Sequence, residues 1–154
     1  MKLRIVTILS FFLFFGCSLP GIYVIDDPLN AQQRNELGFI YESQGQFDLA
    51  EKEYRLAAKR DKKWAVPYFN LGNVYFKMGD YQRAKIHYRQ ALKRDPENPD
   101  FMNNLAYALY KQSEYEEAEK WINRALSIRE DEEYLDTKEK ILSAKSRGTP
   151  AEAP

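Results

Sequence analysis

Residues 65–98 read AVPYFNLGNVYFKMGDYQRAKIHYRQALKRDPEN, and the residues that mark this stretch return 34 positions earlier and 34 positions later. The repeating positions are Leu37, Leu71 and Leu105; Gly38, Gly72 and Ala106; Tyr41, Tyr75 and Leu109; Phe47, Tyr81 and Tyr115; Ala50, Ala84 and Ala118; and Ala57, Ala91 and Ala125. A fixed period of this length is typical of a solenoid whose units bury their apolar faces only against their neighbours. The period therefore favours an extended binding surface over a catalytic site.

Each copy divides into two amphipathic stretches. In the central copy, Val66–Lys77 carries apolar residues at helical spacing, Gly79-Asp80 interrupts the pattern, and Tyr81–Arg94 resumes it. Apolar spacings of three and four residues indicate helices rather than strands, and the short break predicts an antiparallel helix pair. Small residues such as Gly72 predict that the two helices approach closely. The predicted fold class is all-α.

These residues resemble tetratricopeptide repeats. In the central copy the matching positions are Tyr68, Leu71, Gly72, Tyr75, Gly79, Tyr81, Ala84, Tyr88, Ala91 and Pro96. The copies run over residues 31–64, 65–98 and 99–132. They depart from the family pattern at Lys62 (for the closing proline), Ala106 (for glycine), Ser113 (at the turn) and Ile122 (for an aromatic residue). The resemblance implies a solenoid of three antiparallel helix pairs.

The two ends of this domain, which is predicted to span residues 28–145, are set by other signals. Residues 133–145 place apolar side chains at helical spacing among charged ones, which predicts a C-terminal capping helix. Asp27-Pro28 predicts that the first helix begins ahead of the repeat frame, with an N-cap and an N1 proline. Residues 146–154, with glycine, two prolines and no apolar periodicity, are predicted to be a disordered tail.

The N-terminus predicts export. Residues 1–16 read as a signal peptide, because the apolar run that follows Lys2 and Arg4 would reach only about 16 Å as a helix, against about 30 Å for a bilayer core. The following Phe14-Phe15-Gly16-Cys17 resembles the lipobox of bacterial lipoproteins, although the family prefers leucine at Phe14 and a small residue at Phe15. This resemblance implies a lipidated Cys17 and a tether over residues 17–27. The alternative is an incidental thiol within an uncleaved anchor or an ordinary signal peptide.

Charge and composition exclude some partners. The chain has 23 basic and 23 acidic residues, and loss of residues 1–16 would leave 21 basic against 23 acidic. This whole-chain balance predicts no binding to nucleic acid and no electrostatic attraction to anionic headgroups, so acyl chains are expected to supply the membrane attachment. Cys17 is the one cysteine, so a disulfide within the chain is excluded.

Residues typical of a catalytic or cofactor site are missing. His87, the one histidine, is predicted to lie on a solvated helix face. The acidic runs at residues 114–119 and 130–133 are predicted to be solvated helix faces with intrahelical pairs such as Glu116–Lys120. We therefore expect no metal, no cofactor, no small-molecule substrate and no enzymatic activity.

The resemblance also implies a groove. In the family, the first helix of each repeat lines a concave face, and the contacting positions there correspond to Asn35, Phe39, Phe69, Asn70, Asn73, Phe76, Asn103, Asn104, Tyr107 and Tyr110. Asparagine amides pair with an extended peptide backbone, and aromatic rings offer flat apolar contact. Two or three of the aromatic residues are expected to pack between repeats instead.

One family subclass is excluded by the same positions. Repeats that bind chaperone tails hold a C-terminal carboxylate with lysines, asparagines and an arginine. The matching positions here are Asn35, Phe39, Asn70, Asp100 and Asn104. Only Asn70 agrees, and Asp100 would repel a carboxylate.

The function predicted from these features is protein binding. The favoured hypothesis is a membrane-tethered adaptor of the bacterial cell envelope, on the exported side and at the outer membrane of a two-membrane cell, that captures a partner segment in its groove. One alternative is an accessory module of a bacteriocin-processing-type cysteine peptidase system, which the stretch Asp26-Asp27-Pro28-Leu29 resembles. A second is a pilotin-like lipoprotein for pilus or secretin assembly.

Overall fold

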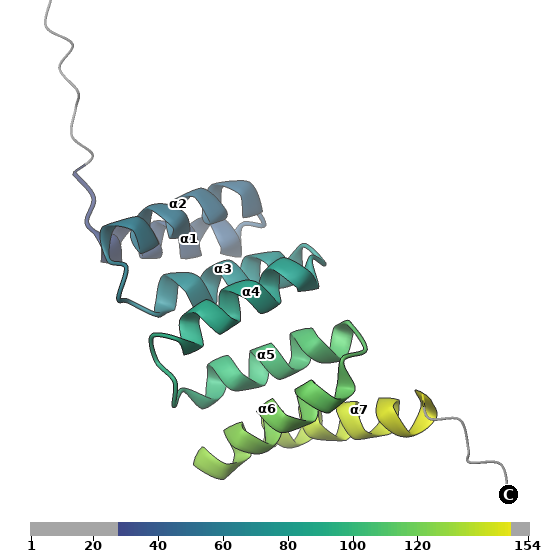
Figure 1. The fold of residues 1–154 in the computed structure, drawn as a ribbon. Coiled ribbons are helices and arrows are strands. Elements are labelled where there is room, and N and C mark those ends of the chain that lie inside the picture. Colours follow the sequence, from purple (N-terminus) through teal and green to yellow (C-terminus); the bar gives the residue numbers. More distant parts are fainter. Residues whose placement is uncertain (1–27, 149–154) are drawn as a thin grey trace, which may run out of the picture.

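The computed structural model describes residues 28–148, and this part of the chain contains seven α-helices and no strand. The helices are α1 (Ala31–Ser43), α2 (Phe47–Arg60), α3 (Val66–Lys77), α4 (Tyr81–Leu92), α5 (Pro99–Lys111), α6 (Tyr115–Ile128) and α7 (Glu132–Gly148). Successive helices run antiparallel and stack along one direction, so that α1 and α7 lie at opposite ends (Figure 1). The described chain is thus an all-α solenoid of three helix pairs with a seventh helix on its last pair.

The close approach predicted at the glycine positions is a contact between a helix backbone and a tyrosine ring. A Cβ atom on Gly38 would lie 2.7 Å from Cδ1 of Tyr54, and one on Gly72 would lie 2.4 Å from Cε1 of Tyr88. Real Cβ atoms do not approach other atoms so closely, so either ring would have to move if the glycine were replaced. In the first two repeats, the fully buried tyrosine of the second helix thus requires a glycine on the first helix.

The turn between the two helices of each pair uses the left-handed backbone region. Gly45 and Gly79 have φ of 73° and 79°, and Ser113 occupies the equivalent position with φ of 63°. Glycine adopts this conformation without a steric penalty, whereas a residue with a Cβ does not. The serine noted as a departure in the third repeat therefore keeps the backbone geometry of the glycine turns.

The repeated small and apolar positions form the core. Ala50, Ala84 and Ala118 are fully buried, as are the alanines at 57, 91 and 125. The terminal helix α7 completes the core, because Tyr134 and Ile141 join the cluster built around the second and third repeats. This helix covers an apolar face that the third repeat would otherwise expose.

The helix ends differ from the predictions at both ends of the domain. The first helix does not begin at Asp27-Pro28: α1 begins at Ala31, and Asn30 caps it, with Gln33 completing a reciprocal pair of side-chain bonds to the backbone. The last helix is longer than 133–145 and continues to Gly148, so residues 146–148 of the predicted tail are helical. The predictions for residues 1–27 and 149–154 lie outside the described residues.

The prediction of a solvated His87 is wrong. The side chain is 8% exposed, and its ring stacks on that of Tyr75 with centroids 5.2 Å apart. Its Nδ1 lies 3.1 Å from Oε1 of Gln90. Burial is the main reason that the pKa of His87 is lowered, and the charge of Arg55 adds to it. The sequence pattern assigned His87 to a solvated face, because its burial depends on packing against a neighbouring helix that the pattern does not show.

The acidic run of α6 also differs from the prediction, because its carboxylates pair between helices. Glu114 pairs with Lys85 of α4, and Glu117 accepts a 2.7 Å hydrogen bond from Arg89, which also lies on α4. On the other side, Lys145 of α7 lies 2.8 Å from Glu119 and 3.8 Å from Glu116. These ion pairs join α6 to both neighbours, and the predicted Glu116–Lys120 pair is not found within residues 28–148.

Candidate functional site

The first helices of the repeats bring four of the predicted groove residues around one pocket of about 150 Å³, which we call the central pocket. Its lining residues are Glu42 of α1; Asn73, Phe76 and Lys77 of α3; Tyr88 of α4; and Asn104 and Tyr107 of α5. The pocket combines amide, aromatic and ionic groups from all three repeats. This is the composition expected of a site that binds both a peptide backbone and a side chain.

The asparagines of this face bond to one another across successive first helices. Asn70 donates to Oδ1 of Asn35 at 3.0 Å, and Asn104 donates to Oδ1 of Asn73 at 3.2 Å. Tyr88 donates to the same Asn73 oxygen at 2.9 Å. Within residues 28–148 no hydrogen bond uses Nδ2 of Asn73, so this amide has donors available to a ligand. Oδ1 of Asn73 is thus engaged by contacts within the described part of the protein, whereas its Nδ2 is not.

Two buried tyrosines fix the polar groups of the central pocket. Burial raises the pKa of Tyr88, so its hydroxyl stays protonated and donates to Asn73. At the other end of the pocket, Tyr54 donates to Oε2 of Glu42 at 2.6 Å, while Nζ of Lys77 lies 2.8 Å from Oε1. The Glu42 carboxylate is thus buried with its charge paired, and the half-exposed ammonium of Lys77 forms the rim.

Aromatic rings continue the groove from this pocket toward α6. The ring of Phe76 stacks on Tyr107 with centroids 5.4 Å apart, and Tyr107 stacks on Tyr110 at 5.6 Å. Tyr81 and Tyr115 contact the two ends of this aromatic row, at 5.1 Å from Phe76 and 6.2 Å from Tyr110. The row offers a continuous apolar strip across the second and third repeats.

A second, more open pocket of about 500 Å³ lies where the aromatic row ends. It is lined by Tyr110, Lys111, Ser113, Tyr115, Ala144, Arg147 and Gly148. Tyr110 of this pocket stacks on Tyr107 of the central pocket, so the aromatic row links the walls of the two pockets. Lys111 and Arg147 give this second pocket a basic character.

Three predicted groove residues have other surroundings. Phe69 stacks on Phe101 at 4.6 Å and contacts Tyr88, so it packs between the second and third repeats. Asn103 is only 3% exposed: it donates to Glu133 of α7 at 3.2 Å, and its Oδ1 is buried without a partner within the described residues. Phe39, in contrast, is 65% exposed on α1. The α7 helix therefore removes Asn103 from the groove, whereas the side chain of Phe39 lies open on the surface of α1.

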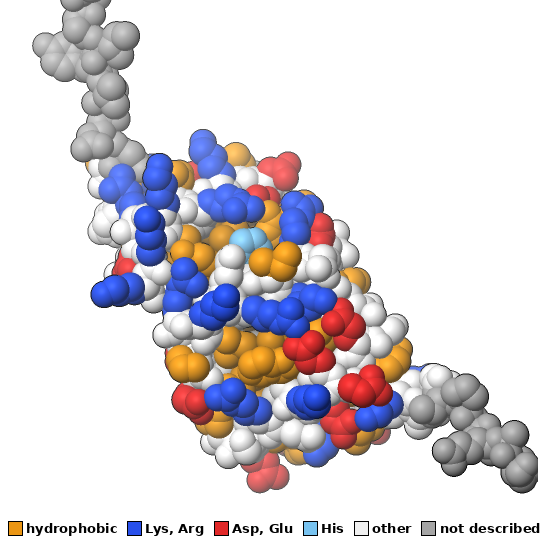
Figure 2. All heavy atoms as spheres, in the orientation of Figure 1, with side chains coloured by type: hydrophobic (Ala, Val, Ile, Leu, Met, Phe, Trp, Pro, Cys, Tyr) orange, Lys and Arg blue, Asp and Glu red, His pale blue; other side chains and the backbone are white. Residues whose placement is uncertain are grey.

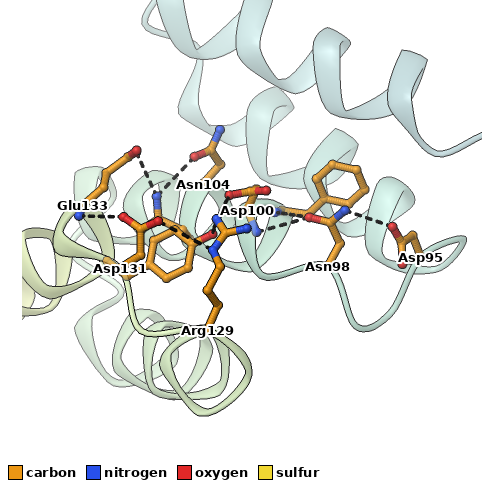
Figure 3. Close-up of polar contacts among 10 residues, drawn as sticks. Asp95, Asn98, Asp100, Asn104, Arg129, Asp131 and Glu133 are labelled. Atoms are coloured by element: carbon orange, nitrogen blue, oxygen red, sulfur yellow. Dashed lines mark hydrogen bonds and ion pairs between the residues drawn. The ribbon is translucent and has the colours of Figure 1, made fainter.

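The acidic residue at the excluded clamp position is part of a structural network. Asp100 pairs with Arg129 and accepts a hydrogen bond from Tyr134, and these contacts fix the start of α7 against α5 (Figure 3). Asn98 caps α5 through the backbone amides of Asp100 and Phe101. A carboxylate clamp would need a cation at this position. The chain has Asp100 there, and its carboxylate is already paired with Arg129 and Tyr134.

The sequence analysis did not identify Glu42, Lys77 and Tyr88 as site residues. Glu42 lies seven residues after Asn35, and Lys77 lies four residues after Asn73, so both share the groove face of their helices. This spacing could have located the ion pair. Tyr88 projects from a second helix toward the groove only because Gly72 leaves room for its ring, and the sequence carries no signal for that.

Other site classes find little support in the described part. Residues 28–148 hold no group of three or more histidine, cysteine, aspartate or glutamate side chains arranged to bind a metal ion. In the same residues, no helix has both the length and the apolar character needed to cross a bilayer.

The helix pairs, their period and the shared groove define an α-helical repeat solenoid. Two models of the tetratricopeptide repeat family match the chain, over residues 29–97 and 69–133. Together they span residues 29–133, and the chain belongs to this family, which confirms the resemblance seen in the sequence.

Solved structures show the same fold. The first repeat domain of Spaghetti (RPAP3), bound to the HSP90 peptide SRMEEVD, is 23% identical with a TM-score of 0.74, over 78% of this chain and 96% of that one. The Arabidopsis OM64 repeat domain is 18% identical with a TM-score of 0.70, over 73% of this chain and 94% of that one. The N-terminal domain of stress-induced protein-1 from C. elegans is 23% identical with a TM-score of 0.66, over the same shares. A search of curated protein sequences finds no match.

Proposed function

We propose that the chain is a membrane-tethered adaptor of the bacterial cell envelope, and that its concave groove binds an extended segment of a partner protein. The observation that carries the proposal is the central pocket, where side chains of all three repeats converge and Asn73 presents unused amide donors beside the rings of Phe76 and Tyr107. An extended peptide needs hydrogen-bond donors for its backbone carbonyls and apolar contact for its alternate side chains. Both are present at the central pocket.

The groove also indicates the chemistry of the segment. A peptide carbonyl would accept from Nδ2 of Asn73, and an apolar side chain would enter the central pocket. Farther along the aromatic row, Lys111 and Arg147 would favour an acidic side chain. The preferred segment is therefore apolar at one position and acidic a few residues away.

The peptide bound by RPAP3 supports a peptide-binding role, because that domain has the same fold and carries an HSP90 peptide. The manner of recognition proposed here is different. Asp100 occupies a position that a carboxylate clamp would require to be basic, and its carboxylate is engaged by Arg129 and Tyr134. We therefore propose recognition of an internal segment rather than of a chain terminus.

The tether is the second part of the proposal, and it rests on the lipobox-like Phe14-Phe15-Gly16-Cys17. Acylation requires the thiol, so Cys17→Ser is expected to abolish incorporation of labelled fatty acid, and the protein is then no longer held by acyl chains. Cys17→Ser protein that still incorporates the label would contradict lipidation at this residue.

A site-specific crosslinking experiment tests the groove. A photoreactive phenylalanine analogue replaces Phe39 or Tyr110 on the concave face, or the 44% exposed Ile86 on α4 as a matched control on the other face. Cells that make the full chain are irradiated, and the adducts are identified by mass spectrometry. We expect both concave positions to give the same partner and Ile86 to give none. A partner captured only from Ile86 would place the binding surface on the second helices instead.

A further inference from the structure

The connections between repeats carry a charge gradient that the balanced whole-chain charge conceals. In the period-equivalent windows, residues 59–64 (KRDKKW) hold four cations and one carboxylate, residues 93–98 (KRDPEN) hold two of each, and residues 127–132 (SIREDE) hold one cation and three carboxylates. The inter-repeat edge of the solenoid is therefore basic near α1 and acidic near α7.

The structure brings the basic residues of two of these connections together. Nε of Arg94, at the end of α4, donates to the backbone oxygen of Lys62 at 2.6 Å, and the Arg94 guanidinium lies 3.5 Å from the ring centroid of Tyr68. This contact holds the α4–α5 connection against the α2–α3 connection. We call the resulting cluster the basic edge; its members are Lys59, Arg60, Lys62, Lys63, Lys93 and Arg94.

The carboxylates within the first two windows offset only part of the charge of the basic edge, because its six cations outnumber Asp61, Asp95 and Glu97. Oδ1 of Asp61 accepts from the backbone amides of Lys63 and Trp64, which fixes the turn, and Asp95 accepts from Asn98. Glu97 pairs with Arg124 of α6. Lys59, Lys62, Lys63 and Lys93 are all exposed, and Figure 2 shows blue side chains gathered over the end of α2 and the connection that follows it.

The basic edge lies on the same side of the solenoid as the start of α1. Antiparallel pairing returns the end of α2 to the level at which α1 begins, and Arg34 in the first turn of α1 pairs with Glu53 of α2 (Figure 1). Residues 17–30, which include the proposed tether, would span at most about 50 Å from Cys17 to the start of α1. The chain would therefore approach a membrane with its basic edge foremost.

We propose that the basic edge docks the solenoid on an anionic lipid surface. Lysine and arginine near such a surface are attracted by its negative potential over a distance of about 10 Å. The half-buried Trp64, directly after Lys62 and Lys63, is a residue type that favours the interface between headgroups and hydrocarbon. Docking on this edge would leave the acidic α7 end away from the surface and the concave groove open to a partner.

Only the orientation of the solenoid on the membrane depends on the proposed tether, so the experiment uses a chain that cannot be acylated. The full chain carrying Cys17→Ser is mixed with phosphatidylcholine vesicles or with vesicles in which about one lipid in three is phosphatidylglycerol, and the bound fraction is measured by sedimentation. Any apolar contact made by the rest of the chain contributes to both vesicle types, so the ratio of the two affinities reports the electrostatic attraction. We expect a preference for the anionic vesicles that high salt abolishes.

Matched charge variants locate the surface. In the same background, Lys62→Glu with Lys63→Glu is expected to lower the affinity for anionic vesicles by about 25-fold or more, at about fivefold for each lysine. The control pair Lys120→Glu with Lys138→Glu, on α6 and α7, makes the same change in net charge and is expected to keep the preference. Equal binding to both vesicle types, or equal losses in the two pairs, would overturn the proposal.

A third arm separates lipid from other polyanions. A duplex oligonucleotide that binds the Cys17→Ser chain more tightly than the anionic vesicles, with loss in Lys62→Glu/Lys63→Glu, would assign the basic edge to nucleic acid instead. Crosslinking of a partner through position 39 does not depend on vesicle binding. Failure of vesicle binding with crosslinking retained would therefore reject this inference alone.

Discussion

The second and third repeats solve the same packing problem with different residues. In the second, Gly72 faces the ring of Tyr88; in the third, the equivalent positions hold Ala106 and Ile122, both fully buried. Compared with the second repeat, the third repeat has an added methyl group on its first helix and a smaller side chain in place of the aromatic ring on its second helix. In the sequence these are two separate departures from the family pattern, and in the structure both residues are fully buried in the same core cluster.

A second difference lies one position earlier on the same helices. His87 of the second repeat is buried against Tyr75, whereas its equivalent in the third repeat is Trp121, whose Nε1 donates to Glu117 at 3.1 Å. The comparison teaches that equivalent positions of the period can differ in burial, because the partner across the contact decides which residue fits there.

The largest expected effect is from Gly72→Leu. The new side chain would have to displace the Tyr88 ring, and with it the hydrogen bond to Asn73, so we expect the free energy of unfolding to fall by about 3 kcal/mol or more. Urea unfolding of the full chain, followed by circular dichroism, measures this change. Gln82→Leu at an exposed position of α4 is the control and should change stability by about 0.5 kcal/mol or less. Equal losses would show that the glycine contact is misassigned.

A double-mutant cycle in the third repeat tests whether the two departures are coupled. Ile122→Tyr alone would press a ring on the methyl group of Ala106 and should cost about 1–3 kcal/mol. Adding Ala106→Gly should restore much of this loss, although glycine inside a helix itself costs about 0.5–1 kcal/mol. We expect a coupling free energy of at least about 0.5 kcal/mol from the cycle. Additive losses would mean that the residues vary independently.

The smallest effect concerns His87 and pH. Because burial lowers the pKa of His87 below its ordinary value of 6.5, the unfolded chain binds the proton more readily than the folded one. The stability that His87 contributes is therefore complete above pH 6.5 and falls as the pH drops from 6.5 toward its folded pKa. His87→Phe, which keeps a ring against Tyr75, should remove this dependence, as measured by thermal unfolding between about pH 7 and pH 5.

The matched variant His87→Ala separates packing from titration. It loses the stacked ring at every pH and should cost about 1–2 kcal/mol even at neutral pH. If His87→Ala leaves stability unchanged, the side chain is not part of the packed contact. If His87→Phe shows the same pH dependence as the parent chain, another group is responsible for it.

Much of the candidate site was predictable, but its internal arrangement was not. The sequence placed Asn73, Phe76, Asn104 and Tyr107 on one face, and these residues do line one pocket. It could not show that Asn73 bonds to Tyr88, because that contact depends on where the second helix lies. Nor could it show that α7 covers Asn103, because helical periodicity does not state which face a terminal helix occupies.

The distribution of charge along the solenoid was hidden for a related reason. A net charge is a sum over the chain, and the basic and acidic connections cancel in it although they lie at opposite ends of one edge. The sequence contains the gradient, but only the antiparallel pairing of helices shows that the connections share that edge and that α1 begins there.

The sequence by itself determined the all-α class, the 34-residue period and the positions that form the core, because helix formation and repeat stacking depend on spacings that are local in the chain. Only the tertiary structure decided the surroundings of individual side chains: the burial of His87, the interhelical pairing of the α6 carboxylates and the basic edge joined by Arg94 and Lys62. The ion pairs and the Arg94–Lys62 contact join residues roughly 30 positions apart that meet only when the repeats stack. His87 instead stacks on Tyr75 of the partner helix in its own repeat.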